Sequence, residues 1–170
     1  MNSLLPADLV ALATRVITAN AAAGRTVAVA ESCTGGLVAA ALTEIPGSSA
    51  VLDRGFVTYS NAAKTQMLDV SEDLIDCFGA VSVAVAWAMA QGALAHSQAD
   101  VAVAITGVAG PDGGSEAKPV GTVIFACAQR AQDPEAVEEE MKLFAEAKNR
   151  SDVRRQAALV ALELLLPPSP

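Results

Sequence analysis

The stretch TVAVAESCTGGLVAAALTEI, from Thr26 to Ile45, decides the fold of this chain. Thr26 to Ala30 is a short apolar run rich in valine, which is typical of a buried strand. The run ends abruptly in polar and glycine residues, and the following LVAAALTEI has helical composition. The stretch therefore predicts a strand, a tight turn and a helix in succession.

The segments on either side continue this alternation. Residues at helical spacing predict an amphipathic first helix, with Gly24 just past its end; they are Leu5, Leu9, Leu12, Val16 and Asn20. Further strands are expected at Val51–Tyr59, Ala99–Thr106, Val120–Ala128 and Ala136–Phe144, and further helices at Asn61–Leu68, Ser71–Phe78, Ser82–Ser97 and Ser151–Leu166. This order predicts an α/β fold, a three-layer α/β/α sandwich with a mostly parallel sheet and at least one antiparallel strand.

Length and composition narrow the class of protein. A chain of 170 residues fits one domain, expected over residues 1–166, with 167–170 as a disordered tail. The net charge of −8 disfavours sequence-independent binding to nucleic acid. The start lacks the pattern of a signal peptide, and the longest apolar stretch falls short of a membrane span, so we expect a cytoplasmic protein. Three cysteines and one histidine without ligand spacing predict neither a disulfide framework nor a metal site.

Glu31-Ser32-Cys33-Thr34-Gly35-Gly36 is the first segment that can carry chemistry. It follows a strand and begins a helix, where free backbone N–H groups suit a phosphate or a developing oxyanion. Taken alone, the segment is better explained as an ordinary helix cap with glycines for tight packing. Cys33 is the rival nucleophile, because a helix start can lower the pKa of a thiol.

The second segment is the glycine-rich loop from Thr106 to Gly114, which leads through Lys118 to the next strand. Loops of this length in a compact domain are functional or disordered, and glycines permit close approach to a ligand. Neither glycine segment matches the phosphate loop of NTPases or the dinucleotide fingerprint, so these two classes are disfavoured.

The third segment runs from Tyr59 through Ser60 and Asn61 to Lys64, at the end of the second strand. Lys64 can face the same crevice as Ser32, and a desolvated lysine is a workable base for a serine hydroxyl. Its spacing misses the known tyrosine–lysine and serine–lysine motifs, and a solvated surface lysine is the alternative.

Arginines gather at the start of the last helix, at positions 150, 154 and 155. Cations there oppose the helix dipole, and a bound phosphate would offset their repulsion. Pairing with Asp152 or with the acidic run 138–140 is the alternative.

In combination these segments resemble a known family. The motifs AESCTGG, YSNAAK, GAVS, TGVAGPDGG, KPVGT and NRSDVRRQAAL, in this order, are similar to the CinA C-terminal domain family in its stand-alone form. The resemblance implies a five-stranded mixed sheet and a metal-free and cofactor-free amidohydrolase that converts nicotinamide mononucleotide to nicotinic acid mononucleotide and ammonia. FAEAKNR departs from a shorter turn in relatives, which puts the placement of Arg150 in doubt.

The resemblance also implies residue roles. The motif serine falls on Ser32 and the motif lysine on Lys64, with Tyr59 beside them as the third catalytic candidate. The expected substrate-binding residues are Glu31, Cys33, Thr34, Gly35, Gly36, Asn61, Thr106, Gly107, Gly110, Gly113, Gly114, Lys118, Arg150 and Arg154. The alternative from another class is a non-catalytic nucleotide-sensing or partner-binding module.

The helix expected from Ser82 to Ser97 suggests an oligomer. Besides a face that can pack on the sheet, it carries a second apolar stripe at Val83, Trp87, Ala90 and Leu94. An apolar stripe of this kind needs a cover, which another helix of the same chain or a second subunit can provide. We expect a homodimer or a larger homo-oligomer.

Overall fold

In the computed structural model, which describes residues 3–168, five strands form one sheet in the order β2-β1-β3-β4-β5. Their bounds are β1 Val27–Glu31, β2 Leu52–Val57, β3 Val101–Gly107, β4 Thr122–Gln129 and β5 Glu138–Leu143. β1 pairs in parallel with β2 and β3, whereas β4 is antiparallel to both of its neighbours. Four of the five strands therefore point the same way, which confirms the mixed, mostly parallel sheet.

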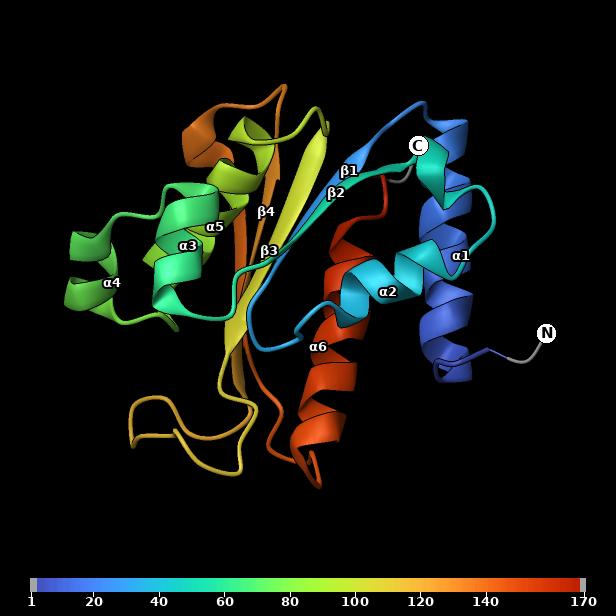
Figure 1. The fold of residues 1–170 in the computed structure, drawn as a ribbon. Coiled ribbons are helices and arrows are strands. Elements are labelled where there is room, and N and C mark those ends of the chain that lie inside the picture. The colour runs from blue at the N-terminus through green and yellow to red at the C-terminus, as the bar shows by residue number, and fades with distance from the viewer. Residues whose placement is uncertain (1–2, 169–170) are drawn as a thin grey trace.

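Helices cover both faces of this sheet (Figure 1). One side carries α1 Ala7–Ala22, α2 Leu37–Thr43 and α6 Arg150–Leu164, and the other carries α3 Asn61–Leu68, α4 Glu72–Phe78 and α5 Val83–Ala95. Two short 3₁₀ turns, η1 Ser48–Ala50 and η2 Pro134–Ala136, lie between elements. The three-layer α/β/α sandwich is confirmed.

The alternation of side chains along the strands separates two cores. In β1, Val27 and Val29 pack with α1, α2 and α6, whereas Ala28 and Ala30 face α5. The strands present mostly alanine to α5, so this helix lies close to the sheet. The closest helix contact is at Gly92 of α5, where a Cβ would lie 2.1 Å from the carbonyl oxygen of Leu68. Glycine at this position lets α3 pack directly on the backbone of α5.

The second apolar stripe of α5 is covered within the chain only in part, since Val83 at its start is 41% exposed. Ala90 and Leu94 are buried, and α3 and α4 both pack against α5. The indole Nε1 of Trp87 donates to the carbonyl oxygen of Pro134, 3.1 Å away, at η2. The chain itself thus covers part of this stripe, and the expected homo-oligomer remains a prediction.

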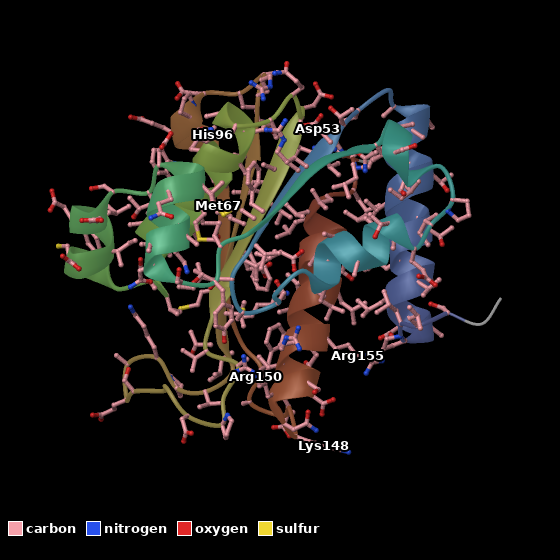
Figure 2. The ribbon with its side chains drawn as sticks, in the orientation of Figure 1. Asp53, Met67, His96, Lys148, Arg150 and Arg155 are labelled. Atoms are coloured by element: carbon pink, nitrogen blue, oxygen red, sulfur yellow. The ribbon has the colours of Figure 1, made fainter. Side chains whose placement is uncertain are left out.

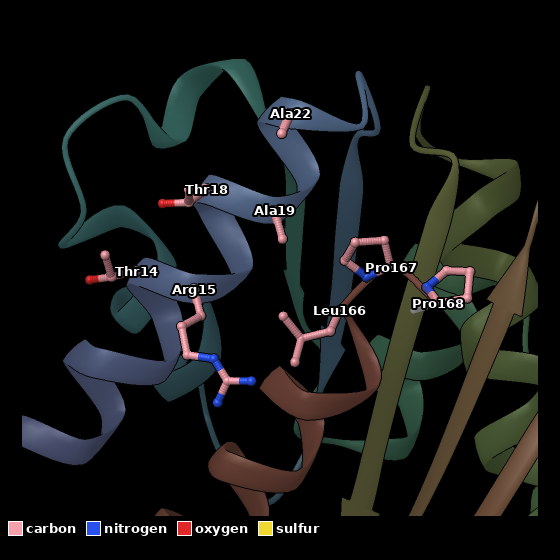
Figure 3. Close-up of a pocket in the computed structure, with 8 residues that line it drawn as sticks. All are labelled: Thr14, Arg15, Thr18, Ala19, Ala22, Leu166, Pro167 and Pro168. Atoms are coloured by element: carbon pink, nitrogen blue, oxygen red, sulfur yellow. The ribbon is translucent and has the colours of Figure 1, made fainter. Parts of the chain in front are cut away.

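Element ends differ from the sequence-based prediction by two residues or fewer. Differences of two residues occur at helix ends, such as α5, and at strand ends, such as β2, where Thr58 and Tyr59 lie beyond the ladder because its last pair is Glu31 with Val57. The single domain over 1–166 remains a prediction. Of the expected tail, 169–170 lie outside the described residues, whereas Pro167 and Pro168 line a groove of about 550 Å³ against α1 (Figure 3). No helix within residues 3–168 has the length and apolarity to cross a membrane.

Candidate active site

A cavity of about 240 Å³ lies beyond the carboxyl ends of β1, β2 and β3. Glu31 pairs with Val57 on one side and Ile105 on the other, so the three strands end at the same level. Ligands of open α/β sheets collect at this edge. The lining residues are Ser32, Cys33, Tyr59, Asn61, Lys64, Ala80, Val81, Thr106, Gly107, Ala109 and Arg150.

Ser32 and Lys64 face each other across this cavity. The Oγ of Ser32 and the Nζ of Lys64 are 3.1 Å apart. The same Nζ donates to the carbonyl oxygens of Thr58 at 3.0 Å and Tyr59 at 3.2 Å. Ser60 begins α3 by accepting a hydrogen bond from the N–H of Ala63, and this cap sets the helix that carries Lys64. The alternative of a solvated surface lysine is excluded, since Lys64 is only 1% exposed.

Burial also changes the acidity of Lys64. Removal from water disfavours the charged ammonium and lowers the pKa of Lys64 below its ordinary value of 10.5. Among residues 3–168, no carboxylate forms a salt bridge with Lys64 that would restore the charged form. A lysine in this state is a base that can accept a proton from the neighbouring hydroxyl.

Glu31 has a different role from the substrate contact that was expected. Its carboxylate is fully buried and accepts hydrogen bonds from the backbone N–H groups of Gly36, Val38 and Ala39. It thus caps α2 and occupies most of the N–H groups that the helix start was expected to offer. The N–H groups of Cys33 and Thr34 have no backbone or side-chain acceptor within residues 3–168.

Cys33 is unsuited to be the nucleophile. Its side chain is buried, and desolvation, reinforced by the nearby charge of Glu31, raises the pKa of the thiol to about 11. The expectation that the helix start lowers the pKa of this thiol is wrong, because the Glu31 carboxylate occupies that helix start. Ser32 remains the nucleophile candidate beside a base.

Arg150 closes one end of the cavity, as Figure 2 shows at the start of α6. Its guanidinium donates to the carbonyl oxygen of Gly110 at 2.8 Å and to the hydroxyl of Tyr59 at 3.0 Å. Beyond it lies a second cavity of about 540 Å³, which also contacts Ala109, Lys148 and Asn149. Arg150 is therefore shared between the two cavities.

Thr106 links the end of β3 to the segment just before α5. Its hydroxyl donates to the carbonyl oxygen of Ala80 at 2.8 Å, and Ala80 and Val81 line the cavity. Neither residue was among the expected site residues, although both belong to the motif GAVS. Alanine and valine have no reactive group, so only the motif itself drew attention to them.

No group of three or more histidine, cysteine or acidic residues within residues 3–168 is arranged to hold a metal ion. The polar side chains that line the cavity carry two hydroxyls, a thiol, a phenol, an amide, an amine and a guanidinium. This donor set suits acyl transfer to and from a serine.

A family model described as the CinA C-terminal domain matches residues 9–167. The chain belongs to the CinA C-terminal domain family. One relative, the nicotinamide-nucleotide amidohydrolase PncC of Escherichia coli (strain K12), is 51% identical over 158 residues, which are 93% of each chain. Among solved structures of the family, the competence/damage inducible protein CihA of Agrobacterium tumefaciens matches with a TM-score of 0.91 and 49% identity, over 96% of this chain and 97% of that one.

Other members of the CinA C-terminal domain family are longer. A putative competence-damage inducible protein of Symbiobacterium thermophilum is 60% identical over 109 residues, which are 64% of this chain and 26% of that relative. The chain spans about a third of a CinA-like protein of a Mycobacterium species, at 54% identity over 84% of this chain.

The residues that the CinA C-terminal domain family implied for the site fall into three groups. Ser32, Cys33, Tyr59, Asn61, Lys64, Thr106, Gly107 and Arg150 line the cavity. Glu31, Thr34, Gly35, Gly36, Gly110 and Arg154 lie behind it, in or against the turns that shape it. Gly113, Gly114 and Lys118 belong to the outer part of the loop, where the Lys118 amine donates to the carbonyl oxygen of Phe78, 3.0 Å away.

Proposed function

We propose that this protein hydrolyses the carboxamide of nicotinamide mononucleotide to nicotinic acid mononucleotide and ammonia, with Ser32 as nucleophile and Lys64 as its base. The contact between Ser32 Oγ and Lys64 Nζ, 3.1 Å long and inside a cavity, carries this proposal. The name of the Escherichia coli relative, a nicotinamide-nucleotide amidohydrolase, supports the substrate.

Desolvation favours the neutral amine of Lys64, and in that form its lone pair can face Ser32. A neutral amine has two N–H groups, and the carbonyl oxygens of Thr58 and Tyr59 accept both. Its lone pair is then left for the hydroxyl proton of Ser32. Once the proton has arrived, the same two carbonyl oxygens stabilise the ammonium.

The reaction proceeds in two halves. The oxygen of Ser32 attacks the carboxamide carbon while Lys64 takes its proton, and the C–N bond breaks as Lys64 returns that proton to the departing ammonia. Water then attacks the acyl group on Ser32 and gives one proton to Lys64, which passes it back to the serine oxygen as the carboxylic acid leaves and ionises, releasing its proton to solvent. The net reaction consumes one water and needs no oxidant or reductant.

The remaining parts of the nucleotide match the walls of the cavity. The cationic pyridinium ring suits the aromatic face of Tyr59, whose side chain is 60% exposed at the mouth. Within residues 3–168, Arg150 has N–H groups without an acceptor besides those bonded to Gly110 and Tyr59, and these suit the phosphate. The second cavity, with Lys148 and Asn149, provides room for that end of the substrate.

The deciding experiment measures ammonia release from nicotinamide mononucleotide by the purified chain, with Ser32→Ala as the control. Turnover by the wild type and none by the variant supports the proposal. Turnover that disappears with EDTA and returns with a divalent ion would contradict a metal-free reaction. Nucleotide binding without ammonia release would instead favour the non-catalytic sensing module.

We also infer a cytoplasmic setting, which is supported by the free thiols of Cys33, Cys77 and Cys127. The net charge of −8 supports the expectation that the partner is a small molecule and not a nucleic acid. A homo-oligomer remains a prediction, to be tested by light scattering.

A further inference from the structure

Arg154 contacts the turn that follows Ser32. From the second turn of α6, its Nε donates to the carbonyl oxygen of Cys33 at 3.2 Å and its Nη2 to that of Thr34 at 2.8 Å. The guanidinium thus spans two successive peptide units, although 120 positions separate Arg154 from Thr34. Arg154 does not line the catalytic cavity.

These contacts orient the N–H groups next to the nucleophile. In a trans peptide the C=O and N–H bonds point in opposite directions. The Cys33 carbonyl points at Arg154, so the N–H of Thr34, which belongs to the same peptide unit, points away from it. Arg154 acts on the N–H of Cys33 only through the turn: the Thr34 carbonyl that it binds shares a peptide unit with the N–H of Gly35, and this N–H donates to the Ser32 carbonyl at 3.0 Å, in the same peptide unit as the N–H of Cys33. These two N–H groups are the ones that Glu31 leaves without an acceptor within residues 3–168.

We propose that Arg154 is a positioning residue that holds the N–H groups of Cys33 and Thr34 as the oxyanion hole of Ser32. The inference rests on the proposed function for its substrate. The guanidinium charge next to the Cys33 carbonyl polarises the peptide and strengthens the N–H of Thr34 as a donor. Donors fixed before the reaction stabilise the tetrahedral oxyanion without reorganisation during the reaction.

This role differs from the phosphate contact expected for Arg154. The Nε and Nη2 groups of Arg154 both donate hydrogen bonds to carbonyl oxygens of the chain itself. The planar guanidinium reaches two neighbouring carbonyls at once, which a single ammonium group cannot do with the same geometry. A lysine at position 154 should therefore only partly replace it.

The test compares Arg154→Gln and Arg154→Lys with the matched control Arg155→Gln. The guanidinium of Arg155 bonds Asp8 on the outer surface of α6, where Figure 2 shows it pointing toward α1. For ammonia release we expect Arg154→Gln to lower kcat by about 10- to 100-fold with little change in KM, since losing one oxyanion donor outright costs about 100- to 1000-fold. Arg154→Lys should lie between Arg154→Gln and the wild type, and Arg155→Gln should match the wild type.

Two further readouts separate positioning from a general structural role. Added guanidinium ion should restore part of the kcat of Arg154→Ala, which a loss of folded protein would not allow. Thermal unfolding identifies any variant that fails to fold, and Arg154→Lys then serves in its place. A rise in KM at unchanged kcat, larger for the nucleotide than for its riboside, would overturn the inference in favour of phosphate binding.

A substrate-independent probe distinguishes this inference from the proposed function. Para-nitrophenyl acetate should acetylate Ser32, measured by intact mass, and Arg154→Gln should slow this step while Arg155→Gln should not. If the wild type is acetylated but releases no ammonia, only the substrate assignment fails, and the comparison of variants still decides on Arg154. Equal acetylation rates in Arg154→Gln and the wild type, or no acetylation of Ser32 at all, would overturn the role of Arg154.

Discussion

Lys64 lies 32 positions after Ser32 in the sequence, yet its Nζ is 3.1 Å from the serine Oγ. The parallel pairing of β1 and β2 brings the two together, because Ser32 follows the last residue of β1 and α3 begins shortly after β2. The sheet therefore positions the pair, and the cap of α3 at Ser60 orients the lysine.

The first prediction concerns this pair. Ser32→Ala and Lys64→Met should each lower kcat for ammonia release by about 10²- to 10⁴-fold or more, because positioned proton transfer typically contributes a factor of about this size. Cys33→Ser should keep most of the activity, because the pKa of that thiol is raised to about 11 by burial. An inactive Cys33→Ser beside an active Ser32→Ala would reverse the assignment.

The second prediction concerns the pH dependence of activity. The pKa of Lys64 is lowered by burial, and the reaction uses the neutral amine. The value of kcat/KM should therefore rise with pH and level off below 10.5, the ordinary value for lysine. A profile that is flat or falls over this range would contradict a lysine base.

The third prediction concerns stability. Unfolding returns Lys64 to water, so between its lowered pKa and 10.5 the unfolded chain binds more protons than the folded one. The contribution of this lysine to the free energy of unfolding should thus increase as pH rises through that window. Urea unfolding of Lys64→Met should show a smaller increase than the wild type, and equal slopes would count against a lowered pKa.

The fourth prediction concerns Arg150. Arg150→Ala should raise KM for nicotinamide mononucleotide by about 10- to 100-fold, equivalent to the 1.5–3 kcal/mol of a charged hydrogen bond. The KM for the dephosphorylated riboside should change much less, and Arg155→Ala should change neither. Equal effects on nucleotide and riboside would assign Arg150 to holding Tyr59 and Gly110 in place.

The fifth prediction concerns the contact between α5 and α3. An alanine inside a helix is ordinarily about 1 kcal/mol better than glycine. Gly92→Ala should instead destabilise the protein by about 1–3 kcal/mol, typical of overpacking, because its Cβ would lie 2.1 Å from the Leu68 carbonyl oxygen. Urea unfolding measures this difference, and a more stable variant would show that the helices separate at little cost.

The sequence by itself determined the layers of this protein and the members of the Ser32–Lys64 pair. Periodicity and turn residues are local properties, so the strand–turn–helix at Thr26–Ile45 and the order of the other elements followed from the chain alone. The order of motifs singled out Ser32, Lys64, Tyr59 and Arg150, all of which line one cavity.

Only the tertiary structure decided what the other polar residues bind. Glu31 and Arg154 look in the sequence like ligand-binding residues, but they hydrogen-bond to the backbone of α2 and of the turn after Ser32. In the same way, the stripe that contains Trp87 suggested a subunit interface, but the fold itself buries its members Ala90 and Leu94. The residue type determines which hydrogen bonds a side chain can make. The actual partner of the side chain depends on which backbone groups the fold brings near it, and such groups can lie far away in the sequence.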